Sequence, residues 1–268
     1  MKTFLIPIAS LLLLAACEKE IDINFHTVSP LYAAEVLLTP DDITAHVMTT
    51  HDVTESNSGS AVVDAVVTIR TKGINWTDTL ENIGKGRYQL PYYAEEGKEY
   101  EVDVYVDGRH HTSTSVMHSM PQVNNFRFVW QDVVSERMLL ADLRLQDSAD
   151  ENNYYFVHLY RNGVGYRWAV TDDMGCPGGE LQMLFTCCTQ RDMEKDEGND
   201  ILREGDVVRI EVRSIDVRTY DYLCSVEQMD QTGTNPIANF SGGMLGYFSA
   251  FQEHKFNVVF HSADVENQ

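Results

Sequence analysis

The sequence has few positive charges. It contains 20 lysine and arginine residues against 41 aspartate and glutamate residues, which gives a net charge of −21 at pH 7. Nucleic-acid binding needs basic patches that neutralise phosphates, and anionic lipid headgroups likewise attract clustered cations. We therefore expect no nucleic-acid partner and no flat attachment of the folded body to an anionic membrane surface.

The common catalytic motifs are also absent from the sequence. There is no G-x-S-x-G, no H-E-x-x-H, no Walker loop and no G-x-G-x-x-G after a strand. Catalytic triads are arrangements in space that a sequence does not reveal, so this absence lowers the expectation of an enzyme without removing it. We predict a protein that is not an enzyme and has no cofactor, with bound calcium as the alternative.

No apolar run is long enough to cross a membrane. Phe4 to Ala16 is apolar, follows Lys2 and ends in small residues directly before Cys17, whereas a transmembrane helix needs about 20 apolar residues. This layout predicts a secretory signal peptide over residues 1–16. Leu14-Ala15-Ala16-Cys17 resembles the bacterial lipobox, which implies that Cys17 carries lipid such as palmitate. Two or three acyl chains form a stable anchor, since each buried methylene contributes about 0.8 kcal/mol.

Residues 17–29 are expected to form an acidic tether. Glu18-Lys19-Glu20-Ile21-Asp22 follows Cys17 directly and resembles the export signal of Bacteroidota-type lipoproteins, which implies the outer face of the outer membrane. By charge alone, a solvated tether would explain the same residues. We expect a lipid-anchored outer-membrane protein that faces the cell surface, and a periplasm-facing body is the alternative.

Only four cysteines remain once Cys17 is assigned to lipid. They are Cys176, Cys187, Cys188 and Cys224, all in the second half of the chain. An oxidising compartment favours disulfides, and four cysteines allow three full pairings. A bridge between Cys187 and Cys188 would be strained, so we expect one of this pair to join Cys176 and the other to join Cys224. Zinc binding is the alternative, although the sequence has no C-x2-C pair.

Residues 30–120 alternate short apolar stretches with turn residues. Seven candidate strands lie between Pro30 and Met117, and strict alternation is clearest in Tyr100-Val102-Val104-Val106. Asp107-Gly108 follows this stretch as the signal of a tight hairpin turn. Short strands at this spacing predict an immunoglobulin-like or fibronectin-like β-sandwich.

Pro121 marks the predicted boundary to a second β-rich domain over residues 121–268. Arg161-Asn162-Gly163 predicts a hairpin turn between two strands. Residues 217–229 place Tyr220, Leu223 and Cys224 at helical spacing, so one short helix is expected there. The predicted fold is therefore all-β, with a second β-sandwich or barrel-like domain that contains one helix.

The most charged loop contains carboxylates at alternate positions. Asp192, Glu194 and Asp196 precede Gly198, and calcium requires six to eight hard oxygen ligands on a flexible loop. The EF-hand pattern is not met, because Glu197 occupies the position where the glycine should fall. We expect either a calcium site or a solvated loop here.

Tyr166 and Trp168 are spaced to share one face of a strand. Aromatic side chains are enriched at binding surfaces, so both are candidates for contact with a ligand. Core packing is the alternative explanation for aromatic residues in a strand.

Two short motifs suggest covalent modification. Asp78-Thr79-Leu80 and Asp147-Ser148-Ala149 resemble the O-glycosylation sites of Bacteroidota envelope proteins. The resemblance implies that Thr79 and Ser148 carry glycans.

The order of several short motifs resembles the DUF4249 family of outer-membrane lipoproteins. Behind the lipobox and tether, these motifs are Gly97-Lys98-Glu99-Tyr100-Glu101-Val102, Pro121, Gly205-Asp206, the helix around Tyr220 to Val226, Asn235-Pro236 and Gly246-Tyr247-Phe248. The resemblance implies a surface lipoprotein of unassigned activity, often encoded near TonB-dependent outer-membrane receptors. We therefore predict an accessory binding component of a TonB-dependent nutrient uptake system that partners a β-barrel receptor, and a structural or adhesive cell-surface protein is the alternative.

Overall fold

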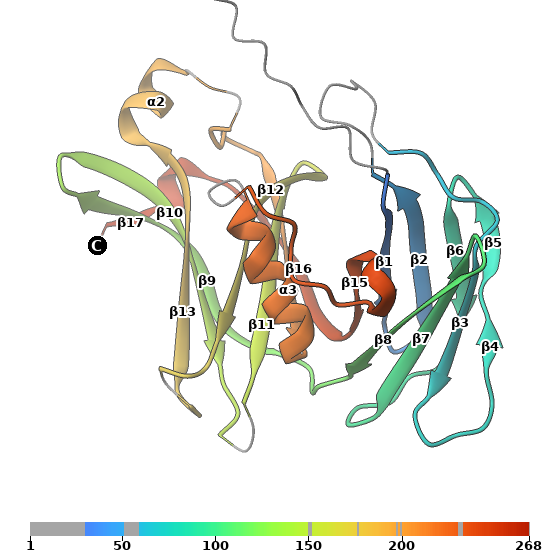
Figure 1. Ribbon diagram of the computed structural model, residues 1–268. Coiled ribbons are helices and arrows are strands. Elements are labelled where there is room, and N and C mark those ends of the chain that lie inside the picture. The colour runs from blue at the N-terminus through green and yellow to red at the C-terminus, as the bar shows by residue number, and fades with distance from the viewer. Residues whose placement is uncertain are drawn as a thin grey trace, which may run out of the picture.

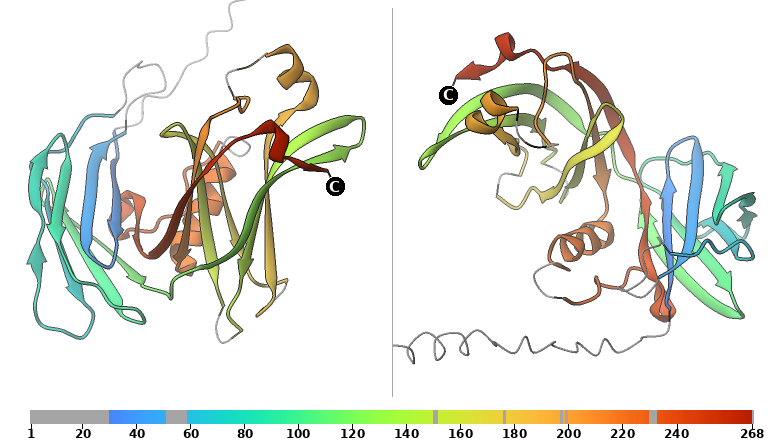
Figure 2. Two further views of the ribbon diagram at one scale, coloured as in Figure 1. Left: turned by 180° about the vertical axis from the view of Figure 1, so that it is seen from behind. Right: turned by 90° about the horizontal axis from the view of Figure 1, so that it is seen from above.

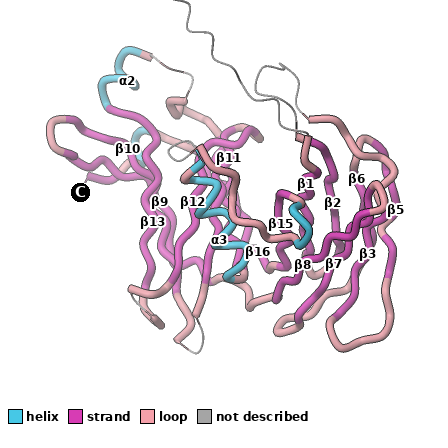
Figure 3. Tube along the Cα trace, in the orientation of Figure 1, coloured by secondary structure: helices cyan, strands magenta, loops and turns pink. Residues whose placement is uncertain are grey.

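The computed structural model consists of four β-sheets that pack in pairs as two β-sandwiches (Figure 1). It describes residues 30–50, 59–149, 152–175, 177–196, 198, 200–229 and 233–267. Strands dominate this part of the chain (Figure 3). The predicted all-β class is confirmed, and each sheet formed by the described strands is open, so the barrel-like alternative for the second half is not adopted.

The first sandwich packs a five-stranded sheet against a four-stranded sheet. Sheet A has the order β15-β1-β2-β6-β5, with β15 (Leu245–Ala250), β1 (Tyr32–Leu38), β2 (Asp42–Thr49), β6 (Arg87–Pro91) and β5 (Glu81–Gly84). Sheet B has the order β4-β3-β7-β8, with β4 (Asp78–Thr79), β3 (Val66–Thr71), β7 (Glu99–Val106) and β8 (Arg109–Val116). Tyr88, Tyr100 and Phe248 are among the largest side chains buried between them.

The hairpin of β7 and β8 follows directly from the sequence. Tyr100, Val102, Val104 and Val106 alternate along β7 and are all buried in the first core, as a half-buried strand requires. Asp107-Gly108 forms the turn with φ values of 48° and 69°, and two residues with positive φ match the twist of the flanking strands. The expected hairpin is confirmed.

The second sandwich packs two four-stranded sheets. Sheet C has the order β13-β10-β9-β17, with β13 (Glu180–Thr189), β10 (Glu136–Gln146), β9 (Gln122–Val133) and β17 (Glu266–Asn267). Sheet D has the order β12-β11-β14-β16, with β12 (Val164–Asp172), β11 (Tyr154–Arg161), β14 (Val207–Ile215) and β16 (Gln252–Val259). Leu143, Leu159 and Phe260 are fully buried in the core between these sheets.

Helices are short in the described chain. α3 (Val217–Glu227) confirms the predicted helix, and it begins at Asp216, whose side chain accepts a hydrogen bond from the backbone N–H of Thr219 at 2.8 Å. The remaining helices are α2 (Gln190–Lys195) and the 3₁₀ turns η1 (Ser241–Gly243) and η2 (Ser262–Asp264). None of the described helices is long and apolar enough to cross a membrane.

Strand β15 belongs to the first sandwich although it lies late in the chain. It pairs in parallel with β1, and Glu35 lies opposite Tyr247. The chain then passes through Phe251 directly into β16 of sheet D (Figures 1 and 2). The predicted division at residue 121 is therefore not a clean spatial boundary: residues 245–250 read as a strand in the sequence, but the alternation of a strand does not say which sheet accepts it.

The two sandwiches meet at a third core between the outer faces of sheets A and D. It contains Phe156, Ile215, Leu223 and Phe251, and the partly buried Leu37 of β1 packs against them. Helix α3 supplies Leu223 and lies beside both sandwiches in Figure 1. The two outer faces diverge from this junction.

Buried polar groups reinforce the junction. Asp216 accepts hydrogen bonds from the Ser115 hydroxyl and from the backbone N–H of Val116. Asn239 Oδ1 accepts from the Ser113 hydroxyl at 2.6 Å and from the Phe248 N–H at 3.0 Å. These contacts tie β8, α3 and β15 together, because a buried polar group that loses its partner costs about 1–3 kcal/mol.

Gly246→Ala tests the pairing of β15 with β1. Gly246 has φ +95°, and a Cβ atom there would overlap the backbone carbonyl of Ala34. We expect the free energy of unfolding to fall by at least about 2 kcal/mol in urea denaturation, because strain and steric overlap add. Gly205→Ala is the matched control, since Gly205 has φ +85° and its added Cβ meets no atom within 4 Å. Equal losses in both variants would contradict the close approach of β15.

Candidate functional site

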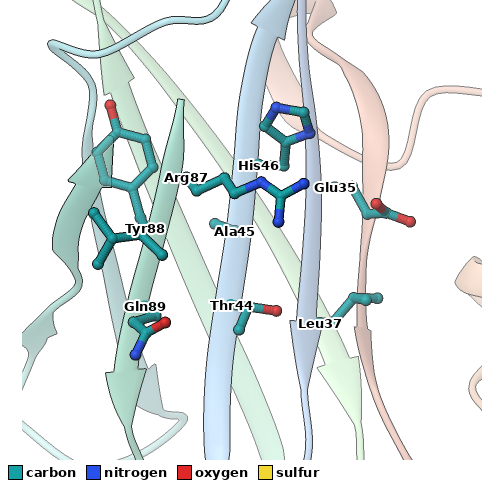
Figure 4. A pocket seen from close by; sticks show the side chains of 9 residues that line it. Glu35, Leu37, Thr44, Ala45, His46, Arg87, Tyr88 and Gln89 are labelled. Carbon is teal, nitrogen blue, oxygen red and sulfur yellow. The ribbon is translucent and has the colours of Figure 1, made fainter. Parts of the chain in front are cut away.

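The outer face of sheet A carries a depression of about 250 Å³. Its walls come from β1, β2 and β6, with one residue from β5 (Figure 4). The lining residues are Glu35, Leu37, Thr44, Ala45, His46, Ile83, Arg87, Tyr88 and Gln89. Because Leu37 of β1 also packs against the junction core, the depression lies beside the contact between the sandwiches.

Strand register places the charged side chains of the depression in one row. Glu35 lies opposite His46, and His46 lies opposite Arg87. Directly opposed residues in neighbouring strands point to the same face of a sheet. The row therefore has a carboxylate at one end, an imidazole in the middle and a guanidinium at the other end, as Figure 4 shows.

Residues of β15 and α3 at the junction between the sandwiches fix the carboxylate end of the row. Tyr247 of β15 donates its hydroxyl to Glu35 Oε1 at 2.8 Å, and its ring stacks on Tyr222 of α3 at 5.1 Å. Burial and the neighbouring Glu35 carboxylate raise the pKa of Tyr247 well above its ordinary value. Tyr247 therefore stays protonated at neutral pH and keeps its hydrogen bond to Glu35.

Arg87 is the unpaired cation of the depression. Its side chain is exposed, and the guanidinium forms no ion pair or hydrogen bond within the described part of the chain. Most other arginines have carboxylate partners; Arg213, for example, contacts Glu211 at 3.0 Å and Glu253 at 3.3 Å. In a chain with a net charge of −21, a free guanidinium in a concave site is available to an anionic ligand group.

The sequence does not single out Glu35, His46 or Arg87. Each occupies an outward position of an alternating strand, where a polar residue is the usual choice. Only the register of β1, β2 and β6 brings them together. The sequence shows only that three strands have a polar residue at an outward position. The order of the strands is needed to recognise that these residues form one site.

The outer face of sheet D carries a second group of aromatic and charged side chains. Trp168, His158, Glu211 and Lys255 lie opposite one another across the four strands. Trp168 is 37% exposed, so it lies at the surface of this face, and its contact with a ligand stays a prediction. Arg209 lies over the neighbouring Tyr160 ring at 4.2 Å.

Tyr166 does not share this face with Trp168, so that expectation was wrong. The register of β11 and β12 shifts between Leu159 and Tyr160, and Tyr166 is the residue left without a partner. Such a β-bulge reverses the side to which the following residues point. Tyr166 packs against the second core and donates its hydroxyl to the Cys187 carbonyl at 3.1 Å, and burial raises its pKa far above its usual value.

The His158 side chain packs closely against its neighbours on the outer face of sheet D. Its ring stacks on Tyr160 at 4.0 Å between centroids, and a Cβ at Gly165 would lie 3.1 Å from its Nε2 atom. Burial lowers the pKa of His158, the Arg213 guanidinium lowers it further, and Glu211 partly opposes both effects. The imidazole is therefore held in its neutral form.

The predicted disulfides are not present among the described cysteines. Cys187, Cys188 and Cys224 are free thiols, and Cys176 lies outside the described residues. A shift of register opposite Leu139 buries both Cys187 and Cys188 in the second core, whereas Cys224 lies on α3. Burial raises the pKa of Cys187 to about 12, so this thiol is neither a reactive nucleophile nor a ready metal ligand.

The candidate calcium ligands lie on and beside α2 rather than in an open loop. Asp192 and Glu194 are two residues apart on this helix, so they do not face each other. Glu194 accepts a hydrogen bond from Gln190 at 2.7 Å, and Asp196 pairs with Arg203 at 2.9 Å. The described residues contain no group of three His, Cys, Asp or Glu side chains that could hold a metal ion.

The two candidate modification sites lie at the surface of the described chain. Thr79 and Ser148 are both exposed, as a glycan would require, and their modification stays a prediction. In the second motif Asp147 is buried and accepts hydrogen bonds from the Tyr155 hydroxyl at 2.9 Å and the Gly178 N–H at 2.7 Å. Cys17 and its tether lie outside the described residues.

His158→Gln tests whether His158 is neutral in the folded protein. Because the folded pKa of His158 lies below the value of about 6.5 in an unfolded chain, the unfolded chain binds a proton near pH 6 that the folded protein does not bind. The stability advantage of neutral His158 is therefore complete above about pH 6.5 and is lost as pH falls. We expect urea unfolding at pH 7.5 and 5.5 to show a larger loss of stability on acidification for the parent than for the variant; equal losses would contradict a neutral His158.

A search of curated proteins finds no match. Among solved structures, the chain is similar to a segment of two fibronectin type III domains from chicken tenascin, with 10% identity, a TM-score of 0.23 and coverage of 87% of this chain and 100% of that one. The model of the family described as "Domain of unknown function (DUF4249)" matches residues 18–257. The resemblance seen in the sequence is thereby confirmed at the level of the family: the chain belongs to DUF4249.

Proposed function

We propose that the protein is a lipid-anchored binding protein of the outer membrane that serves a TonB-dependent nutrient uptake system. The depression on sheet A carries this proposal, because Glu35, His46 and the unpaired Arg87 converge there on three neighbouring strands. Ligand sites are usually preformed concave surfaces with a few convergent polar groups. Strands buried on their inner face hold such groups in fixed positions.

Binding fits this site better than catalysis. Thr44 and His46 are neighbours in the lining, but no hydroxyl or thiol of the described residues donates a hydrogen bond to His46. A nucleophile needs an adjacent base of this kind. The charged groups of the depression are arranged to hold a ligand rather than to transform it.

The short distance to the anchor supports an accessory role. The tether of residues 17–29 contains 13 residues, so it spans at most about 45 Å when fully extended. Strand β1 begins at Tyr32, directly behind the tether, and contributes Glu35 to the depression. A lipid on Cys17 would therefore keep the site close to the membrane, where a β-barrel receptor takes up its substrate.

A structural or adhesive role is the second candidate. The observation that favours it is the outer face of sheet D, where the 37% exposed Trp168 lies next to His158 and the Tyr160–Arg209 pair. Exposed aromatic and arginine side chains are enriched at protein–protein interfaces. This face would then bind another surface protein, and the depression on sheet A would have no ligand.

Affinity purification of the full-length protein from detergent-solubilised outer membrane tests the proposal. We expect one β-barrel receptor to co-elute in stoichiometric amount, identified by mass spectrometry. Cys17→Ala is the control, since this variant lacks the acylated cysteine and should lose both membrane fractionation and the receptor. Recovery of the acylated protein without any receptor would contradict the uptake role and favour adhesion.

A further inference from the structure

We propose that the depression on sheet A binds a small zwitterion, an α-amino acid with an apolar side chain. This inference deepens the proposed function, because it names the ligand class of the same site. Arg87 would bind the carboxylate of the ligand, Glu35 would bind its ammonium group, and Leu37, two residues from Glu35 on the same face of β1, would contact its side chain.

The spacing of the charged groups supports a ligand that carries both charges. Glu35 and Arg87 lie in the same row on either side of β2, so their backbones are about 10 Å apart. Figure 4 shows the Arg87 side chain extending from β6 across β2 in the direction of β1. Arg87 and Glu35 form no ion pair among the described residues, and His46 lies between their strands. The adjacent ammonium and carboxylate of an amino acid would bridge the two charged groups.

Electrostatics disfavours ligands with a single charge. A simple anion would bind Arg87 but would meet the Glu35 carboxylate and the field of a chain with a net charge of −21. A simple cation would bind Glu35 but would be repelled by Arg87. A zwitterion satisfies both groups at once, so the site selects by repulsion as well as by attraction.

The size and the remaining lining limit the ligand further. A volume of about 250 Å³ lies below the range of drug-sized pockets, which favours a ligand of about the size of an amino acid over an oligosaccharide or a cofactor. Leu37 lies two residues from Glu35 on the same face of β1, so an aliphatic side chain has apolar surface to cover beside the ammonium group. We expect an affinity on the order of 0.1–1 mM for so small a ligand.

Isothermal titration of the purified full-length protein in detergent with three probes tests the inference. The probes are L-leucine, 4-methylpentanoate, which lacks the ammonium group, and 3-methylbutylamine, which lacks the carboxylate. We expect L-leucine to bind and each of the other two to bind at least about 10-fold more weakly, since each loses a charge-assisted contact.

Two variants locate the binding site. Arg87→Gln and Glu35→Gln should each weaken L-leucine binding at least about 10-fold, and glutamine at position 35 can still accept the Tyr247 hydrogen bond. Arg109→Gln and Glu95→Gln are the matched controls, because both residues are exposed, have no side-chain ion pair among the described residues and lie outside the depression. The controls should bind L-leucine like the parent protein.

The outcomes separate this inference from the proposed function. Absence of L-leucine binding at 10 mM, equal binding of 4-methylpentanoate, or unchanged binding in Arg87→Gln would each overturn the zwitterion site. Co-purification of a receptor would still support the uptake role in that case. Selective leucine binding without a receptor would retain the ligand class and remove the transporter.

Discussion

The architecture depends on one continuous segment that leaves sheet A as β15 and enters sheet D as β16. Phe251 lies between the two strands and is buried in the junction core. The backbone of this segment forms hydrogen bonds with strands of both sandwiches. Displacing β15 from sheet A would therefore strain sheet D, and displacing β16 from sheet D would strain sheet A. The N-cap residue Asp216 and the buried Asn239 add polar contacts that would be costly to break.

This arrangement determines what the outer faces can do. Helix α3 and Phe251 cover the part of each face nearest the junction, and the other described residues leave the rest of each face open. On sheet A the open part contains the row of Glu35, His46 and Arg87, and Tyr247 of the shared segment fixes the carboxylate of that row. A site whose end is formed by the joining strand is rigid only while the two sandwiches remain attached.

Local patterns were sufficient to predict the local elements. The alternation from Tyr100 to Val106, the Asp107-Gly108 turn and the helix around Leu223 all depend on residues close in sequence. The pairing of β15 with β1 and the bulge at Tyr166 were not predictable, because they depend on which distant strand is the neighbour. The row of Glu35, His46 and Arg87 was not predictable for the same reason. Its three side chains come from three strands, and a single sequence does not reveal the order of those strands.

Native-state hydrogen exchange in increasing urea tests most directly whether the two sandwiches form one unit. We expect the slowest amides of β2 in sheet A and of β14 in sheet D to open with the same free energy, because the shared segment couples the sheets into one cooperative structure. Opening of the first sandwich at a free energy lower by about 2 kcal/mol or more, with sheets C and D still protected, would contradict it. The segment from β15 to β16 would then only link two independent domains, and the depression would belong to the first domain alone.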